Sequence, residues 1–163
     1  MSTAVVREYL RRFGKADAVM EFTESSATVA LAAEKVGTEP ARIAKTLAFY
    51  DPDEPRRAVL VVAAGDARLH NGSFKREIGG KPRMLAAADV EALTGHPVGG
   101  VCPFANPAGT RVYLDESLRR FETVYPAAGT AASAVPMTLA ELELAAAAVG
   151  WVTVTNRWQP EED

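Results

Sequence analysis

The chain of 163 residues is long enough for one domain with its own core, and its 48% hydrophobic and 24% charged residues are typical of a globular protein. The formal net charge of −3 excludes a strongly basic protein. The charge is unevenly distributed: residues 1–90 contain fourteen Lys and Arg against twelve Asp and Glu, and residues 91–163 contain four against nine. Short apolar runs and the lack of a signal-peptide core after Met1 exclude a membrane protein, while a local basic face for nucleic acid stays open.

The spacing of apolar residues predicts the elements of the first quarter of the chain. Gly14 and Gly37 are placed to end two helices, and Ser25 or Ser26 is placed to cap the second one. We expect a helix over residues 5–13, a strand over 18–22, a helix over 27–36 and a capped turn over 38–42.

Residues 43–49 are predicted to form a buried strand with one unusual position. Lys45 shares a face with Ile43, Leu47 and Phe49. A buried ammonium costs several kcal/mol unless it is paired or opens into a cleft. Two interpretations remain: Lys45 extends to water at a strand end, or it points into a polar pocket built on the sheet.

The remaining pattern predicts a mixed α+β fold in a single domain. Residues 57–64 are apolar on both faces, so we expect a central strand that pairs with the Lys45 strand as a hairpin. Further helices are expected over 72–78, 86–93 and 139–148, and strands over 82–85, 111–115, 121–125, 134–137 and 151–155. The sheet is expected to be mixed and mostly antiparallel, or a partly open barrel, flanked by short helices. The domain is expected to span residues 1–158, followed by an acidic tail over 159–163.

Most known catalytic motifs are missing. The sequence has no P-loop, no G-x-G-x-x-G, no H-E-x-x-H and no G-x-S-x-G elbow. Its single cysteine, Cys102, excludes an internal disulfide and a cysteine-rich zinc site, and it favours a reducing cytoplasm. Cys102 follows His96 by six residues, so a Cys–His nucleophile is one hypothesis and a small packing residue is the other.

A loop dense in Gly and Pro over residues 96–104 is the remaining candidate. Gly99 and Gly100 allow the backbone to approach a ligand closely and to direct N–H groups at it, and Pro103 stiffens the far end. Combined with a lysine in a pocket, such a loop suits a carbonyl or phosphate oxygen.

These segments together resemble a known family. Residues 43–47, 65–66, 94–104 and 112–118 come in the order and spacing of the YbaK/EbsC family, which belongs to the superfamily of the bacterial prolyl-tRNA synthetase editing (INS) domain. The resemblance covers about residues 20–150. It implies a free-standing trans-editing factor, an aminoacyl-tRNA deacylase that hydrolyses the ester of a mischarged tRNA, often tRNA(Pro). It implies the aminoacylated 3′ end of tRNA as a partner, allows a prolyl-tRNA synthetase as another, and implies no cofactor, metal or membrane.

The resemblance also carries residue roles. Lys45 matches the family lysine, Gly99 to Pro103 match its G-x-x-x-P loop, and Gly129 matches a glycine near the end of the sheet. Many relatives have a serine in the segment before that glycine and another where Cys102 stands, and here the segment reads Pro-Ala-Ala over residues 126–128. The family has no protein nucleophile, so the resemblance implies catalysis assisted by the substrate's own terminal ribose 2′-hydroxyl, or by a substrate thiol.

The candidate site residues fall into three sets. Lys45, Gly99 and Gly100 are the candidates for catalysis, with Thr46 or Asp66 as the expected partner of Lys45. The candidates for contact with the substrate are Thr46, Thr28, Phe22, Leu47, Val98, Val101, Cys102, Pro103, Asp66 and Gly129, with Val29 beside them. The candidates for contact with tRNA phosphates are Arg68, Lys75, Arg76, Lys81 and Arg83. Two alternatives stay open: a non-catalytic module of the same fold that binds aminoacyl-tRNA or a nucleotide, and a small-molecule hydrolase that uses Cys102.

Overall fold

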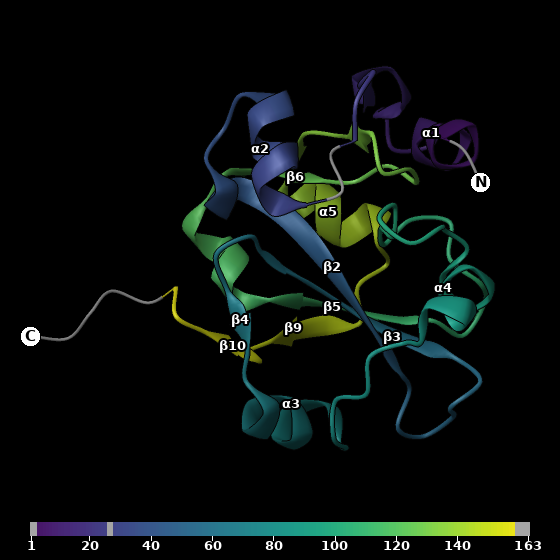
Figure 1. Ribbon diagram of the computed structural model, residues 1–163, viewed down its shortest axis with the longest axis vertical. Helices are drawn as coiled ribbons and strands as arrows, with labels where there is room; N and C mark the ends of the chain where they lie inside the picture. The colour runs from purple at the N-terminus through teal and green to yellow at the C-terminus, as the bar shows by residue number, and fades with distance from the viewer. Residues whose placement is uncertain (1–2, 26–27, 159–163) are drawn as a thin grey trace, which may run out of the picture.

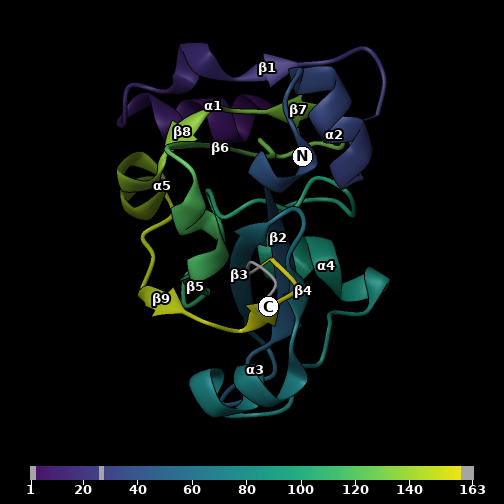
Figure 2. The same cartoon turned by 90° about the vertical axis from the view of Figure 1, so that its left-hand side faces the viewer.

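A computed structural model describes residues 3–25 and 28–158, in which α-helices surround a central β-sheet (Figure 1). A six-stranded sheet runs in the order β8-β6-β2-β3-β5-β9. Helices α1 and α2 lie at one end of the molecule and α3 at the other, as both views show (Figures 1 and 2). The helices are α1 (Thr3–Arg11), α2 (Val29–Val36), α3 (Asn71–Ile78), α4 (Ala87–Thr94) and α5 (Leu139–Ala145), with 3₁₀ turns η1 (Ala16–Ala18), η2 (Pro40–Arg42) and η3 (Glu116–Arg120). The strands are β1 (Met20–Glu21), β2 (Ile43–Tyr50), β3 (Ala58–Ala64), β4 (Arg68–Leu69), β5 (Arg111–Asp115), β6 (Thr123–Pro126), β7 (Ser133–Ala134), β8 (Met137–Thr138), β9 (Gly150–Val152) and β10 (Thr155–Asn156).

Strands β2 and β3 form the predicted hairpin at the centre of the sheet. They pair antiparallel from Ala44↔Ala64 to Tyr50↔Ala58. All seven residues of β3 are fully buried because β2 and β5 flank it and side chains cover both faces. Ala44 and Ala48 pack in the larger core cluster and Phe49 in a second cluster with Phe74, so the two faces of β2 contribute to separate parts of the core.

The sheet is mixed, as predicted. In the described part of the chain, four strand pairings are antiparallel and three are parallel. The three parallel pairings, β2 with β6, β3 with β5 and β5 with β9, all lie in the six-stranded sheet. Among the described helices, none is both long and apolar enough to cross a membrane.

Several element boundaries differ from the prediction. The cap of α2 is Thr28, whose side chain accepts a hydrogen bond from the Leu31 N–H, while Ser26 and the predicted acidic tail over 159–163 lie outside the described residues. Ser25 instead donates to the Ala131 carbonyl. Residues 82–85 form only one bridge, between Met84 and Phe49. The last expected strand is two short strands, β9 and β10, and β4 was not predicted.

Candidate active site

Lys45 is held in place by backbone carbonyls at the end of β3. Its Nζ donates to the Gly65 carbonyl at 3.3 Å and to the Ala67 carbonyl. Burial lowers the pKa of the Lys45 ammonium, and the charge of Asp66 opposes that shift. Neither expected partner bonds to it: the Asp66 carboxylate pairs with Arg120 at 2.6 Å. Lys45 is therefore an oriented cation with two of its three donors in use.

The edge of β2 away from β3 is open around Lys45. Strand β6 pairs with this edge only at Ile43 and Ala44. Residues 83–85 cover its far end, where the Tyr50 N–H donates to the Arg83 carbonyl and the Leu85 N–H to the Ala48 carbonyl. The open stretch between these two contacts contains Lys45 and Thr46.

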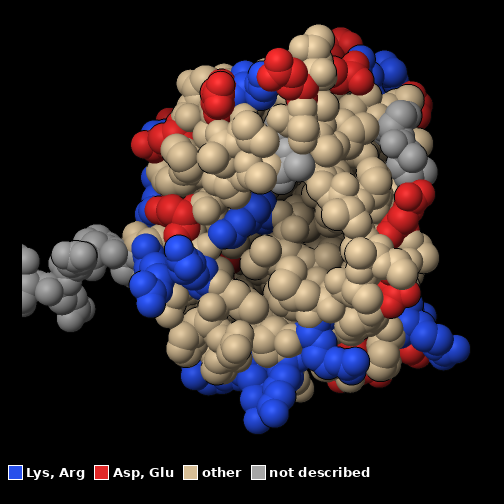
Figure 3. Space-filling view, viewed as in Figure 1, with Lys and Arg blue, Asp and Glu red and all other residues tan. Residues whose placement is uncertain are grey.

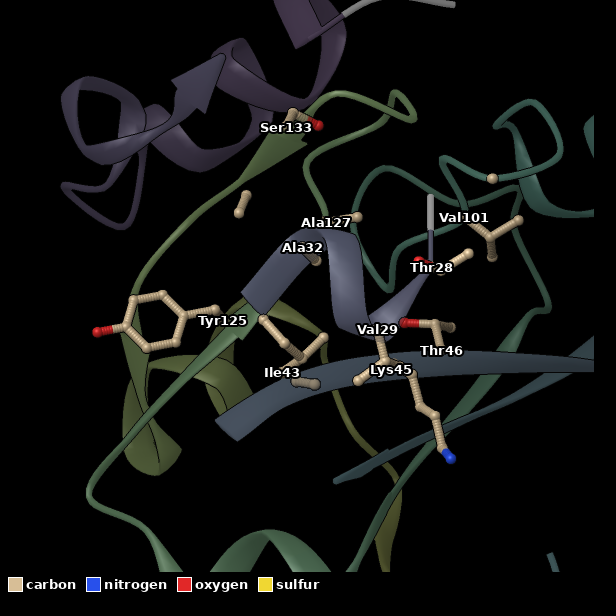
Figure 4. A pocket seen from close by; sticks show the side chains of 13 residues that line it. Thr28, Val29, Ala32, Ile43, Lys45, Thr46, Val101, Tyr125, Ala127 and Ser133 are labelled. Atoms are coloured by element: carbon tan, nitrogen blue, oxygen red, sulfur yellow. The ribbon is translucent and has the colours of Figure 1, made fainter. Parts of the chain in front are cut away.

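A pocket of about 190 Å³ lies at this open stretch (Figure 4). Lys45 and Thr46 leave β2 on opposite sides, as Figure 4 shows, so the pocket wraps around the strand edge. The Thr46 hydroxyl is buried and has no hydrogen-bond partner among the described residues. The lining comes from α2, β2, the glycine loop and the β6–β7 region: Thr28, Val29, Ala32, Ile43, Ala44, Lys45, Thr46, Gly99, Val101, Tyr125, Ala127, Ser133 and Ala134.

Helix α2 forms the apolar wall of the pocket. The Thr28 cap fixes its first turn, and Gly37 ends it in the left-handed conformation at φ 83°. Ala32 and Ala33 pack with Ile43, and Val29 contacts the same cluster. The wall is therefore made of small aliphatic side chains on a helix with both ends fixed.

The glycine loop rests on the turn at Gly129 and Thr130. A Cβ on Gly100 would lie 2.7 Å from Thr130 Cα and 2.9 Å from the Gly129 carbonyl oxygen, so only glycine allows this approach. The Gly100 N–H donates to the Pro97 carbonyl at 2.9 Å. Gly100 thus holds the loop against the turn, and Gly99, exposed at φ 88°, is the glycine that lines the pocket.

Ser133 lines the pocket, although no motif in the sequence marks it as a site residue. Its hydroxyl accepts from the Ala128 and Thr130 N–H groups at 3.1 and 3.3 Å and donates to the Thr130 carbonyl. It therefore stabilises the turn that carries Gly129. The family serine that is missing before Gly129 thus has a counterpart after it: the Ser133 hydroxyl lies in the same turn.

Cys102 faces the core. The side chain is fully buried, and burial raises the pKa of its thiol to about 12. Its Sγ lies 3.4 Å from Nε2 of His96, which is also fully buried and contacts the Phe104 carbonyl at 2.6 Å. The two residues are adjacent, as a Cys–His pair requires, but a thiol that stays protonated and out of contact with solvent is a packing residue. The hypothesis of a hydrolase that uses Cys102 is therefore wrong.

His96 gives a pH prediction. Burial lowers its pKa from 6.5, and Nδ1 has no partner among the described residues, so protonation would place an unpaired charge in the core. Because the unfolded chain binds that proton more readily, we expect the free energy of unfolding to be constant above about pH 6.5 and to fall as the pH drops below it. Thermal unfolding between pH 5 and 7.5 measures this. His96→Gln is expected to flatten the curve, and an unchanged slope would contradict the assignment.

The structure brings together six of the predicted residues and separates others. Lys45, Thr46, Thr28, Gly99 and Val101 line the pocket, as does Val29. Leu47, Asp66 and Arg68 lie with Lys45 in a second hollow. Six predicted residues lie outside the lining of the first pocket: Gly100 and Gly129 where the loop meets the turn, buried Cys102 and Pro103, half-buried Phe22 and exposed Val98.

The predicted basic residues are exposed, and none forms an ion pair within the described ranges. Figure 3 shows a hollow bordered mainly by uncharged side chains, with Lys and Arg gathered below it over α3 and beside β4. Arg68 lies in β4, and Lys75 and Arg76 lie in α3. Lys81 and Arg83 follow in the segment after α3.

Fold and site together define a class: one α+β domain with a small pocket at an open strand edge, an apolar wall from α2, a fixed lysine in its lining and a glycine loop at its rim. Comparison with known proteins places the chain within that class. The model of the aminoacyl-tRNA editing domain family matches residues 23–144. The chain belongs to this family, in its YbaK-like branch.

Similar proteins cover the whole domain. The chain is 42% identical over 159 residues to the uncharacterized protein YwhH of Bacillus subtilis (strain 168), and the match covers 98% of this chain and 100% of YwhH. It is 30% identical, with a TM-score of 0.84, to a crystal structure described as "a putative trans-editing enzyme for prolyl tRNA synthetase", covering 96% of this chain and 99% of that chain. The hypothetical protein APE2540 is 31% identical with a TM-score of 0.81, covering 93% and 99%.

Proposed function

We propose that the protein is a trans-editing aminoacyl-tRNA deacylase that hydrolyses the ester of a tRNA, tRNA(Pro) or a related one, carrying a small wrong amino acid. The observation that carries the proposal is the pocket at Lys45 in a chain of the editing-domain family. A structure of 30% identity described as "a putative trans-editing enzyme for prolyl tRNA synthetase" supports the choice of tRNA(Pro) and of that synthetase as a partner.

The size and lining of the pocket favour a small amino acid. Its volume of about 190 Å³ is near that of an engineered cavity of about 150 Å³ that binds benzene. Val29, Ala32 and Ile43 give it an apolar side that suits a short aliphatic chain. A synthetase separates such near-isosteres by only about 1–3 kcal/mol, which is why a second sieve is useful.

The proposed chemistry needs orientation and charge stabilisation rather than a protein nucleophile. The neighbouring 2′-hydroxyl of the terminal ribose assists water in attacking the ester carbonyl, the C–O bond to the ribose breaks, and the amino acid leaves with the ribose hydroxyl restored. Lys45 steadies the ribose–phosphate end or the developing negative charge, and the glycine loop lines the same pocket through Gly99 and Val101. The exposed basic residues over α3 and beside β4 meet acceptor-stem phosphates.

The test is a panel of labelled aminoacyl-tRNAs in which release of free amino acid and equilibrium binding are followed in parallel. Release faster than spontaneous hydrolysis, confined to small amino acids, is the expected result. Tight binding with no accelerated release would replace the deacylase with a non-catalytic aminoacyl-tRNA-binding module of the same fold.

Filling the pocket is expected to remove activity. Ala32→Leu adds three carbons to the apolar wall and should lower kcat/KM by at least about tenfold, because overpacking and lost substrate contact each cost on the order of 1–3 kcal/mol. Ala30→Leu is the matched control, since Ala30 is exposed on the same helix. Steady-state deacylation by both variants checks this. Equal loss in the two would show that the effect is not steric filling of the pocket.

A further inference from the structure

We infer that the groove on the other side of Lys45 is the site of the 3′-terminal nucleotide of the tRNA, with the phosphate at Lys45 and Arg68 and the base against Met84 and Leu69. This inference rests on the proposed function. It adds the position of the nucleotide and a side chain, Met84, that would recognise the base.

The groove has a different size and chemistry from the amino-acid pocket. Its volume is about 530 Å³, against about 190 Å³. Both hollows are lined by Lys45, so a ligand that fills both must pass this side chain. An aminoacyl ester joins a small side chain to a much larger nucleotide, which matches a small and a large hollow on the two sides of one cation. The groove is lined by Lys45, Leu47, Phe49, Gly65, Asp66, Ala67, Arg68, Leu69 and Met84.

The charges in the groove favour an anion. Arg120 contacts both Asp66 carboxylate oxygens, at 2.6 and 2.9 Å, so the one carboxylate in the lining is already neutralised. Arg68 is exposed and forms no ion pair within the described ranges. Burial lowers the pKa of Lys45, the charge of Asp66 opposes that shift, and the nearby charge of Arg68 adds to it. Two neighbouring cations beside a carboxylate that is already paired with Arg120 suit a phosphate.

The apolar side of the groove suits a base. Met84 is 60% exposed and lines the groove, so its thioether is accessible to a ligand there. Its backbone is fixed against β2 by the bridge to Phe49 and by the hydrogen bonds of its neighbours, Arg83 and Leu85. Leu47 and Leu69 are half-buried beside it. A polarizable thioether on a rigid support can lie against the face of any base.

The test is a binding cycle that needs no turnover. Two RNA hairpins with the same acceptor stem, one ending in CCA and one in CC, are titrated against wild type, Met84→Ala and Leu144→Ala. Leu144 is the control because it is 70% exposed on α5, outside both hollows. We expect wild type and Leu144→Ala to bind the CCA hairpin about fivefold or more tightly than the CC hairpin, and Met84→Ala to lose most of that difference, by comparison with base stacking on other side chains.

The outcomes separate this inference from the proposed function. Any of three results would overturn the nucleotide site: wild type binds the two hairpins with equal affinity, wild type binds neither hairpin, or Met84→Ala weakens the binding of both hairpins equally. Arg68→Ala should weaken both hairpins and reduce the salt dependence of binding, and an unchanged affinity would remove the phosphate contact. If wild type discriminates the hairpins through Met84 but deacylates nothing, the nucleotide site holds and the deacylase fails.

Discussion

Lys45→Met is expected to reduce deacylation by at least about a hundredfold while the fold is retained, the loss seen when a fixed charge or donor is removed from a developing oxyanion. The side chain becomes one atom shorter, stays unbranched and loses the ammonium that bonds to the Gly65 and Ala67 carbonyls. The loss of these hydrogen bonds destabilises the folded protein, whereas the removal of a buried charge stabilises it. Because the two effects oppose each other, we expect the free energy of unfolding to change by no more than about 2 kcal/mol.

Single-turnover release of a labelled amino acid, with thermal unfolding in parallel, measures both quantities. Lys35→Met is the matched control, because Lys35 lies on α2 and pairs with Glu24 at the surface. Its turnover should equal that of wild type. Wild-type turnover in Lys45→Met would remove the lysine from the mechanism, whatever happened to stability.

Gly65→Ala is expected to cause the largest loss of stability. A Cβ at this position would lie 2.0 Å from the Pro40 carbonyl oxygen and 2.7 Å from Cγ1 of Val29. The first contact is with backbone, which cannot rotate away, so the η2 turn or the end of β3 must move. We expect a loss of about 3 kcal/mol or more, which lowers Tm by about 6–12 °C in a domain of this size.

The control for this variant is Gly150→Ala, since no described residue other than its two chain neighbours has an atom within 4 Å of a Cβ built there. Its free energy of unfolding should stay within about 1 kcal/mol of wild type. Denaturant unfolding of both variants decides the matter. Equal stability of Gly65→Ala and Gly150→Ala would show that the approach of Gly65 to Pro40 is not required by the fold.

The hairpin and the lysine could be predicted because each has a local pattern. Side chains alternate between the two faces of a strand, so the sequence over 43–49 places Lys45 on a face with apolar neighbours. Residues 58–64 are apolar on both faces, which is typical of a strand in the centre of a sheet. The glycine loop was likewise marked by its composition. These features depend on residues near each other in the chain.

The partners of Lys45 and the role of Ser133 could not be predicted in the same way. Lys45 bonds to carbonyls, which every residue has, so no side chain marks them. Ser133 lies in an alanine-rich stretch with no motif, and only the folded turn at Gly129 brings its hydroxyl to the pocket. The two-residue strands β4 and β10 depend on each other across the chain rather than on local preference.

The glycine pair shows how composition can predict a location without a role. Both glycines belong to the loop, but Gly100 is fixed against Thr130 with its N–H already bonded, and Gly99 is the one exposed at the pocket. The difference arises from the packing of the loop on a turn some thirty residues later in the sequence, to which local spacing gives no signal.

Hydrolysis of alanyl-tRNA(Pro) by the wild-type protein tests the central claim most directly, with the same tRNA carrying phenylalanine as the size control. We predict release of alanine well above the spontaneous rate and lost in Lys45→Met. We predict release of phenylalanine at the spontaneous rate, because a ring that by itself fills a cavity of about 150 Å³ leaves too little of the pocket's 190 Å³ for the α-amino and ester groups. Release of both amino acids at the spontaneous rate, with the protein folded, would contradict the account.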